Sequence, residues 1–183
     1  MGVTSVAMNR LHIVGGKNHG KTTLVCELVE LFAARGLRVG TIKHTHHAHE
    51  LDTPGKDSHR HRKAGAAVVG ILSPGLSAVF WPPADDERTD RYAAFAPRMA
   101  GCDLVLVEGD SATTAPKVEV WREAAGGAPR FAADRSTLAI ISDDPLGAPL
   151  AASPLPVMPR SADDLADRLL SLLAAARQDG TRG

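Results

Sequence analysis

One short segment narrows the possible folds of this chain more than any other. Residues 15–22 read Gly-x-x-x-x-Gly-Lys-Thr, the Walker A pattern, directly after the apolar run 11–14 and before leucines at helical spacing. Glycines let the backbone curl so that successive N–H groups face inward, and the positive end of the following helix adds to their field. The pattern in this strand–loop–helix context predicts a phosphate-binding loop.

This loop supplies most of the residues that we expect to bind a nucleotide. Lys21 is expected to neutralise the β- and γ-phosphates, and Thr22 to offer its hydroxyl to Mg²⁺. Lys17 has two interpretations: it reaches a nucleotide across a dimer interface, as in some dimeric P-loop proteins, or it is a solvated loop lysine. The predicted nucleotide-binding residues of the loop are Gly15, Gly16, Lys17, Asn18, His19, Gly20, Lys21, Thr22 and Thr23.

The rest of the chain alternates apolar strands with helical patterns, which is typical of an α/β fold. The patterns predict strands over residues 37–42, 103–108, 118–121 and 137–141, a hairpin of residues 66–72 and 76–81, and a linking loop over 145–159. Helices are expected over residues 55–63, from the acidic cluster 85–87 to near Pro97, and after a capping box of Ser161 and Asp164. Together they predict one P-loop NTPase-like domain over residues 1–183, with a mostly parallel sheet flanked by helices, an inserted β-hairpin and a loose tail at residues 1–9.

Composition excludes several classes of protein. Lys+Arg and Asp+Glu both count 21, so the basic excess of a nucleic-acid or membrane-surface binder is missing. No apolar run approaches the ~20 residues that a membrane span needs, and the first ten residues do not have the pattern of a signal peptide. Cys26 and Cys102 are the only cysteines, which fits a reducing compartment. We expect a cytoplasmic protein that binds neither nucleic acid nor membrane.

Two acidic residues are candidates for holding Mg²⁺ together with Thr22. Glu108 ends a buried strand, where a Walker B acid would face the phosphate loop; the alternative is a carboxylate that caps the strand end. Asp52 lies in the segment after the strand 37–42, where many P-loop proteins place a switch residue. It either reaches the metal or is solvated at the surface.

Histidines are concentrated in the polar segment that follows this second strand. Six of the eight lie between residues 44 and 61, but their spacing matches no tetrahedral metal site. Imidazoles mixed with lysine and arginine suit an anionic ligand, so we expect an anion- or substrate-facing loop; metal binding and a plain surface are the alternatives. The residues assigned to this loop are Lys43, His44, His46 and His47.

Recognition of a purine base has only a weak sequence signal. The guanine-reading pattern Asn-Lys-x-Asp is missing, since the only asparagines are Asn9 and Asn18. Asp143 or Asp144, directly after the apolar run 137–141, could accept two hydrogen bonds from the N1 and N2 donors of guanine. The alternative is a capped turn before Pro145.

Four segments resemble the family of molybdopterin-guanine dinucleotide biosynthesis protein B, the MobB family of P-loop GTP-binding proteins. They are residues 15–24, residues 39–47 with Asp52, residues 55–58 with 64–66, and residues 103–109 followed by 116–120. The lysine–histidine segment and the Glu-Gly strand end are more distinctive than the P-loop. In one departure, Asp110-Ser111 stands where the family often has an aromatic residue and a lysine, so a substrate-holding role of that lysine does not carry over.

The resemblance implies a homodimeric adaptor that binds GTP and Mg²⁺. Its implied partners are molybdopterin and the guanylyltransferase that joins GMP to molybdopterin. Two other functions are compatible with a P-loop: an ATP-dependent small-molecule kinase or ligase, and a nucleotide-gated metal chaperone that uses the histidines. Because no glutamine follows Glu108-Gly109 to orient water, we expect at most a slow GTPase.

Overall fold

The structure, a computed structural model, describes residues 8–82, 90–147 and 149–180. The chain divides into two compact units: a larger one of residues Met1–Thr45 and Ala96–Gly183, and a smaller one of residues His46–Phe95. Of the predicted tail, residues 1–7 lie outside the described residues, and the first strand begins at Arg10. That all 183 residues form one domain stays a prediction.

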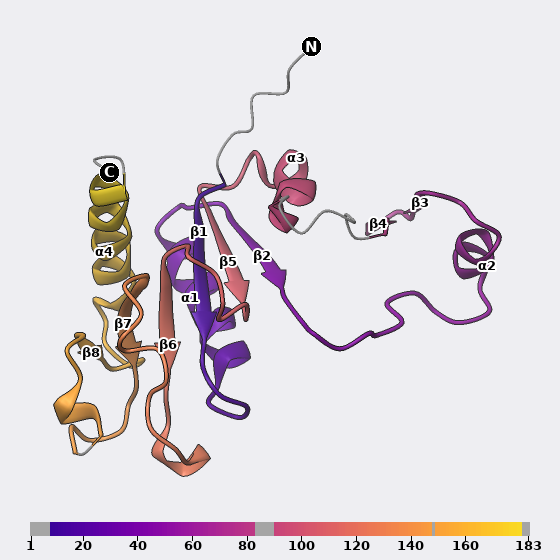
Figure 1. Cartoon of the computed structure of the whole chain (residues 1–183). Coiled ribbons are helices and arrows are strands. Elements are labelled where there is room, and N and C mark those ends of the chain that lie inside the picture. The colour runs from indigo at the N-terminus through magenta and orange to yellow at the C-terminus, as the bar shows by residue number, and fades with distance from the viewer. Residues whose placement is uncertain (1–7, 83–89, 148, 181–183) are drawn as a thin grey trace. The chain divides into compact units, whose positions relative to one another are not determined.

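A six-stranded sheet forms the centre of the larger unit (Figure 1). Its order is β2-β5-β1-β6-β7-β8, and every neighbouring pair is parallel. The strands are β1 (Arg10–Val14), β2 (Val39–Lys43), β5 (Leu104–Glu108), β6 (Lys117–Val120), β7 (Thr137–Ile141) and β8 (Val157–Met158). The predicted parallel α/β sheet is confirmed.

Two long helices bury their apolar stripes in the same core as the sheet. Helix α1 (Lys21–Ala34) contributes Leu24, Leu28 and Phe32. Helix α4 (Leu165–Gly180) contributes Leu165, Leu169 and Leu173 at the same helical spacing. They pack with the strand residues Leu11, Ile13, Leu104, Leu106, Val118, Val120, Ala139 and Ile141. Trp121, Ile140 and Leu150 form a separate, smaller cluster.

Two predictions at the C-terminal side of the sheet are wrong. The expected linking loop 145–159 contains a 3₁₀ helix (Leu150–Ala152) and the strand β8, which is too short to show an alternating pattern. Pro156 is tolerated there because its carbonyl accepts the N–H of Ile140 at 3.0 Å and an edge strand needs no second donor. Ser161 does not cap α4: the helix begins at Leu165, and the Ser161 hydroxyl donates to Asp143 at 3.4 Å.

The smaller unit contains a short helix and a hairpin. Helix α2 (Asp57–Lys63) and the antiparallel pair β3 (Val69–Leu72) and β4 (Ser77–Phe80) confirm the predicted helix and inserted hairpin. The acidic cluster 85–87, expected to start a helix, lies outside the described residues. A 3₁₀ helix (Arg91–Phe95) follows.

In the larger unit, α3 (Ala96–Met99) follows directly. The helix that was predicted to end near Pro97 therefore extends to Met99. Pro97 lies in the first turn of α3, where its missing N–H costs no hydrogen bond.

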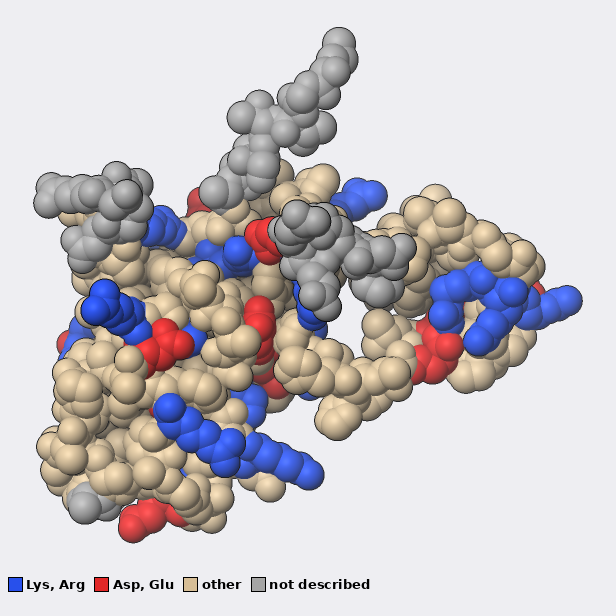
Figure 2. All heavy atoms as spheres, in the orientation of Figure 1, with Lys and Arg blue, Asp and Glu red and all other residues tan. Residues whose placement is uncertain are grey.

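Surface charge is mixed in sign. Figure 2 shows Lys and Arg interspersed with Asp and Glu on the visible face. Within the described residues, no helix is both long and apolar enough to cross a membrane. That the chain binds no nucleic acid stays a prediction.

A buried histidine in β1 makes the stability of the fold pH-dependent. His12 is fully buried, and its Nδ1 lies 3.4 Å from the carbonyl oxygen of Gly109. Burial lowers the pKa of His12 from 6.5 to about 4; Arg10 and Lys117 lower it further, against opposing effects of Gly109 and Asp110. The unfolded chain therefore takes up this proton first as the pH falls, so stability is present at neutral pH and is lost from about pH 6.5 towards pH 4.

We expect the titration of His12 alone to lower the free energy of unfolding by about 2 kcal/mol when the pH falls from 7 to 5. Urea denaturation at both pH values measures the loss. His12→Asn keeps a donor near Gly109 and removes the titration, so its loss over the same interval should be smaller by that amount. Equal losses in the two proteins would contradict the assignment.

Candidate functional site

The predicted phosphate loop joins β1 to α1 and is shaped by its contact with β6. Gly15 has φ +142° and Gly20 has φ +94°, both in the left-handed region that favours glycine. A Cβ on Gly15 would lie 2.4 Å from the carbonyl oxygen of Val120, so a side chain there would displace the loop from the neighbouring strand. Asn18 also adopts a positive φ, at 66°.

Lys21 folds back over this loop. Its Nζ donates to the carbonyl oxygens of Gly15 at 3.1 Å and Gly16 at 2.8 Å. Burial lowers the pKa of Lys21; Glu108 opposes this shift and Lys43 adds to it. An ammonium group carries three donors, so Lys21 can keep these two contacts and still donate to a phosphate oxygen.

The two predicted metal-binding groups of the larger unit lie against each other. The Thr22 hydroxyl donates to Glu108 Oε1 at 2.8 Å, although the two residues are 86 positions apart in the chain. Lys43 Nζ lies 3.7 Å from the same oxygen. This proximity follows from the sheet, since β5 pairs with both β1 and β2 and places Glu108 opposite Ile13 and Lys43. Hydroxyl and carboxylate oxygens of this kind are the ligands that Mg²⁺ prefers.

His19 has a supporting position in the loop. It is buried, and its Nδ1 accepts the backbone N–H of Arg122 at 3.0 Å, which ties the loop to the segment after β6. Burial, with Lys21 as a further cause, lowers the pKa of His19, so the ring stays neutral and keeps this acceptor. Lys17, Asn18 and Thr23 are exposed.

The two candidate base-binding acids differ in their contacts. Asp144 Oδ2 accepts the backbone N–H of Glu123 at 2.8 Å and the Ser142 hydroxyl at 3.3 Å, so this carboxylate stabilises the turn. Asp143 is half-exposed and has Oδ1 bonded to the backbone N–H of Ser161 at 3.2 Å. Of the two, Asp143 keeps the more accessible carboxylate.

Asp52 lies in the smaller unit and is only 8% exposed, so its interpretation as a solvated surface carboxylate is wrong. Its Oδ1 accepts the Ser58 hydroxyl at 2.9 Å and the backbone N–H of Thr53 at 2.8 Å. Next to it, Glu50 pairs with Arg62, which holds the pKa of Glu50 at about 2. A metal-binding role for Asp52 stays a prediction.

The histidine segment provides no assembled metal site. His44 is half-buried and donates its backbone N–H to the Glu108 carbonyl at 2.9 Å, while Lys43, His46 and His47 are exposed. Among the residues that the structure describes, no three His, Cys, Asp or Glu side chains are grouped as metal ligands. The structure therefore gives no support to the metal alternative.

Two buried charges on β6 had no predicted role. Lys117 is fully buried; its Nζ donates to the carbonyl oxygens of Ser111 at 2.9 Å and Thr113 at 3.0 Å and to Asp134 at 2.6 Å. Glu119 accepts two backbone N–H groups, from Arg130 at 2.8 Å and Phe131 at 3.0 Å. The sequence could have predicted these contacts, because a lysine and a glutamate in an otherwise apolar strand are rarely buried unless they are paired.

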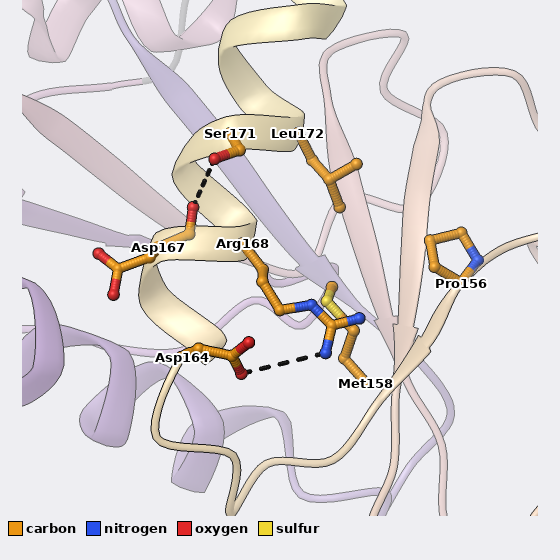
Figure 3. A pocket seen from close by; sticks show the side chains of 7 residues that line it. All are labelled: Pro156, Met158, Asp164, Asp167, Arg168, Ser171 and Leu172. Carbon is orange, nitrogen blue, oxygen red and sulfur yellow. Dashed lines mark hydrogen bonds and ion pairs between the residues drawn. The ribbon is translucent and has the colours of Figure 1, made fainter.

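A cavity of about 380 Å³ lies against α4 and β8, and none of its lining residues belongs to the P-loop (Figure 3). Its charges are mutually compensated: Arg168 lies 4.0 Å from Asp164, and Asp167 pairs with Arg35 at 2.7 Å. The charged side chains that line this cavity are therefore already paired and do not favour a charged ligand. We assign the candidate site to the P-loop, whose lysine and backbone suit phosphate chemistry.

Comparison with known proteins decides the family. The family described as molybdopterin guanine dinucleotide synthesis protein B, MobB, matches residues 10–143. The chain belongs to the MobB family. This match confirms the resemblance seen in the sequence, and it includes the P-loop, Glu108 and Asp143.

Individual MobB relatives agree with this assignment. The molybdopterin-guanine dinucleotide biosynthesis adapter protein of Escherichia coli (strain K12) is 41% identical over 129 residues, which is 69% of this chain and 74% of that protein. The adapter protein of the same name from Haemophilus influenzae is 36% identical over 113 residues, 62% of this chain and 63% of its own length.

Solved structures of the family share the fold. The MobB protein homolog from Bacillus stearothermophilus is 29% identical, with a TM-score of 0.61 over 92% of this chain and 99% of that one. A second structure, described as molybdopterin-guanine biosynthesis protein B (mobB), is 26% identical, with a TM-score of 0.64 over 90% of this chain and 99% of that one. Their similarity confirms the P-loop NTPase-like α/β architecture.

Proposed function

We propose that this chain is a cytoplasmic GTP-binding adapter in molybdenum cofactor maturation, where it assists the attachment of GMP to molybdopterin. The observation that carries the proposal is the Thr22–Glu108 hydrogen bond beside Lys21, in a chain of the MobB family. Relatives in this family are named biosynthesis adapter proteins, and that name supports a role beside a transferase. Unpaired Cys26 and Cys102 fit a reducing compartment.

The nucleotide is held by charge and by oriented backbone dipoles. The loop from Gly15 to Gly20 and the first turn of α1 direct N–H groups at the phosphates, and Lys21 neutralises the β- and γ-phosphates. Thr22 and Glu108 hold Mg²⁺ as a direct or water-bridged pair, since this ion retains several waters. Asp143 accepts hydrogen bonds from the guanine edge.

A homodimer is supported by the apolar surface of the hairpin. Leu72, at 90% exposed, and Leu76, at 75%, lie at its tip, and Val68 lies just before it, also exposed. A two-stranded hairpin alone is marginally stable in water, and exposed apolar residues around it favour contact with another chain. A second copy of the hairpin is the proposed partner.

The lysine–histidine segment is proposed to face the anionic partner substrate. Lys43 ends β2, and His44, His46 and His47 follow it. The phosphate of molybdopterin is a ligand that these donors suit. The guanylyltransferase is the proposed protein partner.

Replacement of Lys21 tests the nucleotide site. Lys21→Ala leaves the triphosphate charge uncompensated, so we expect GTP affinity to fall by about 2–4 kcal/mol, roughly 30- to 1,000-fold. Isothermal titration calorimetry measures the change. The exposed Arg38, just before β2 at the opposite edge of the sheet, provides a control, and Arg38→Ala should bind as the wild type does. Unchanged affinity in Lys21→Ala would move the nucleotide to another site.

Replacement of Glu108 tests the metal ligands. Glu108→Gln keeps the shape of the side chain and removes its charge, so it should weaken GTP binding in Mg²⁺ more than binding in EDTA. Asp103→Asn, just before the opposite end of β5, is the matched control and should not alter this difference. The same loss with and without Mg²⁺ would argue against a metal role for Glu108.

Hydrolysis is expected to be slow. A P-loop turns over rapidly when a side chain orients the attacking water and a cation stabilises the transferring phosphoryl group. Glu108 is followed by Gly109 and Asp110 and not by a glutamine. We predict less than about one turnover per second for the protein alone, measured as phosphate release. Tens of turnovers per second without a partner would contradict the adapter function.

A further inference from the structure

Two arginines from distant parts of the chain lie at the last glycine of the P-loop. A Cβ on Gly20 would lie 3.4 Å from Arg160 Nη1 and 3.7 Å from Arg122 Cδ. Arg122 follows β6, whereas Arg160 follows β8 and lies outside the segment 10–143 that matches the MobB family. The fold therefore brings a C-terminal guanidinium to the start of α1.

The Arg160 guanidinium is held in a fixed plane. Its Nε donates to Glu27 Oε2 at 3.1 Å, and its Nη2 donates to Glu27 Oε1. This two-bond contact uses one edge of the guanidinium, and the side chain is only 19% exposed. Because Glu27 lies on α1, the contact fixes Arg160 relative to the P-loop and leaves Nη1 directed at Gly20.

The same segment also orients Asp143. Ser161 donates its backbone N–H and its hydroxyl to Asp143 Oδ1, at 3.2 and 3.4 Å. Arg160 Nε lies 3.9 Å from the other oxygen, Oδ2. The residues after β8 thereby hydrogen-bond one oxygen of the carboxylate that follows β7 and place a positive charge near the other. Glu27 connects this arrangement to α1.

We propose that Arg160 is a specificity-determining residue of the nucleotide site, which rests on the proposed function. Its charge keeps the Asp143 carboxylate, hydrogen-bonded by the adjacent Ser161, in place for the purine, and its Nη1 is available to the ribose and α-phosphate oxygens of the nucleotide. Guanine offers N–H donors at N1 and N2 to such a carboxylate. Adenine presents an acceptor at N1, which a fixed carboxylate repels, so the arrangement selects GTP over ATP.

The test compares the dissociation constants of Mg²⁺–GTP and Mg²⁺–ATP by calorimetry, with thermal melting as a check on folding. For Arg160→Met we expect at least a tenfold loss of GTP affinity and a GTP-to-ATP preference that falls towards one. Arg35→Met is the matched control: Arg35 makes a similar two-bond contact with Asp167, at 2.9 and 2.7 Å, just after α1, and its loss should leave both affinities unchanged.

A purely structural role would lower the melting temperature but leave the preference intact, and a folded Arg160→Met with wild-type preference would overturn the inference. If Arg160→Met does not fold, Glu27→Gln loosens the same contact and should reduce the preference in the same direction; an unchanged preference there overturns the inference too. A wild-type protein that binds neither nucleotide overturns the proposed function, and this inference with it.

Discussion

Parallel pairing of the central strands is the constraint on which the candidate site depends. Because β1, β5, β6 and β7 run in the same direction, all four end at one edge of the sheet. The P-loop, Glu108, Arg122 and Asp143 each follow or end one of these strands. No single segment holds a complete site; the sheet assembles one from segments that are far apart in the chain.

Buried polar side chains fix the loops beside this sheet. Glu119 accepts two backbone N–H groups of the segment after β6, and His19 accepts a third. At the start of β6, Lys117 donates to two backbone carbonyl oxygens and so fixes the segment that follows Glu108-Gly109. Removing a buried partner of this kind leaves polar groups unsatisfied, which costs more than a surface contact contributes. Loop geometry is thus determined by the strands themselves.

Patterns of neighbouring residues were enough to predict the fold and the P-loop. They could not predict contacts between residues that are far apart in the chain. The strand–loop–helix pattern identified residues 11–34, and the acid at the end of a buried run identified Glu108. An edge strand of two residues between prolines is too short to show an alternation of apolar and polar residues, so β8 was not predicted. Arg160 was missed for a related reason: its role depends on Glu27, 133 residues away, and on how the chain folds back onto α1.

The order of these contacts along the chain has a consequence for synthesis of the protein. Residues 15–22 leave the ribosome early, but the strands on either side of β1 come from residues 104–108 and 117–120. Until those strands emerge, the loop lacks both the neighbour that shapes Gly15 and the carboxylate beside Thr22. Nascent chains that end before residue 104 therefore carry the phosphate-binding sequence without either neighbouring strand, and the contact of Arg160 with α1 forms only after β8 has also been made.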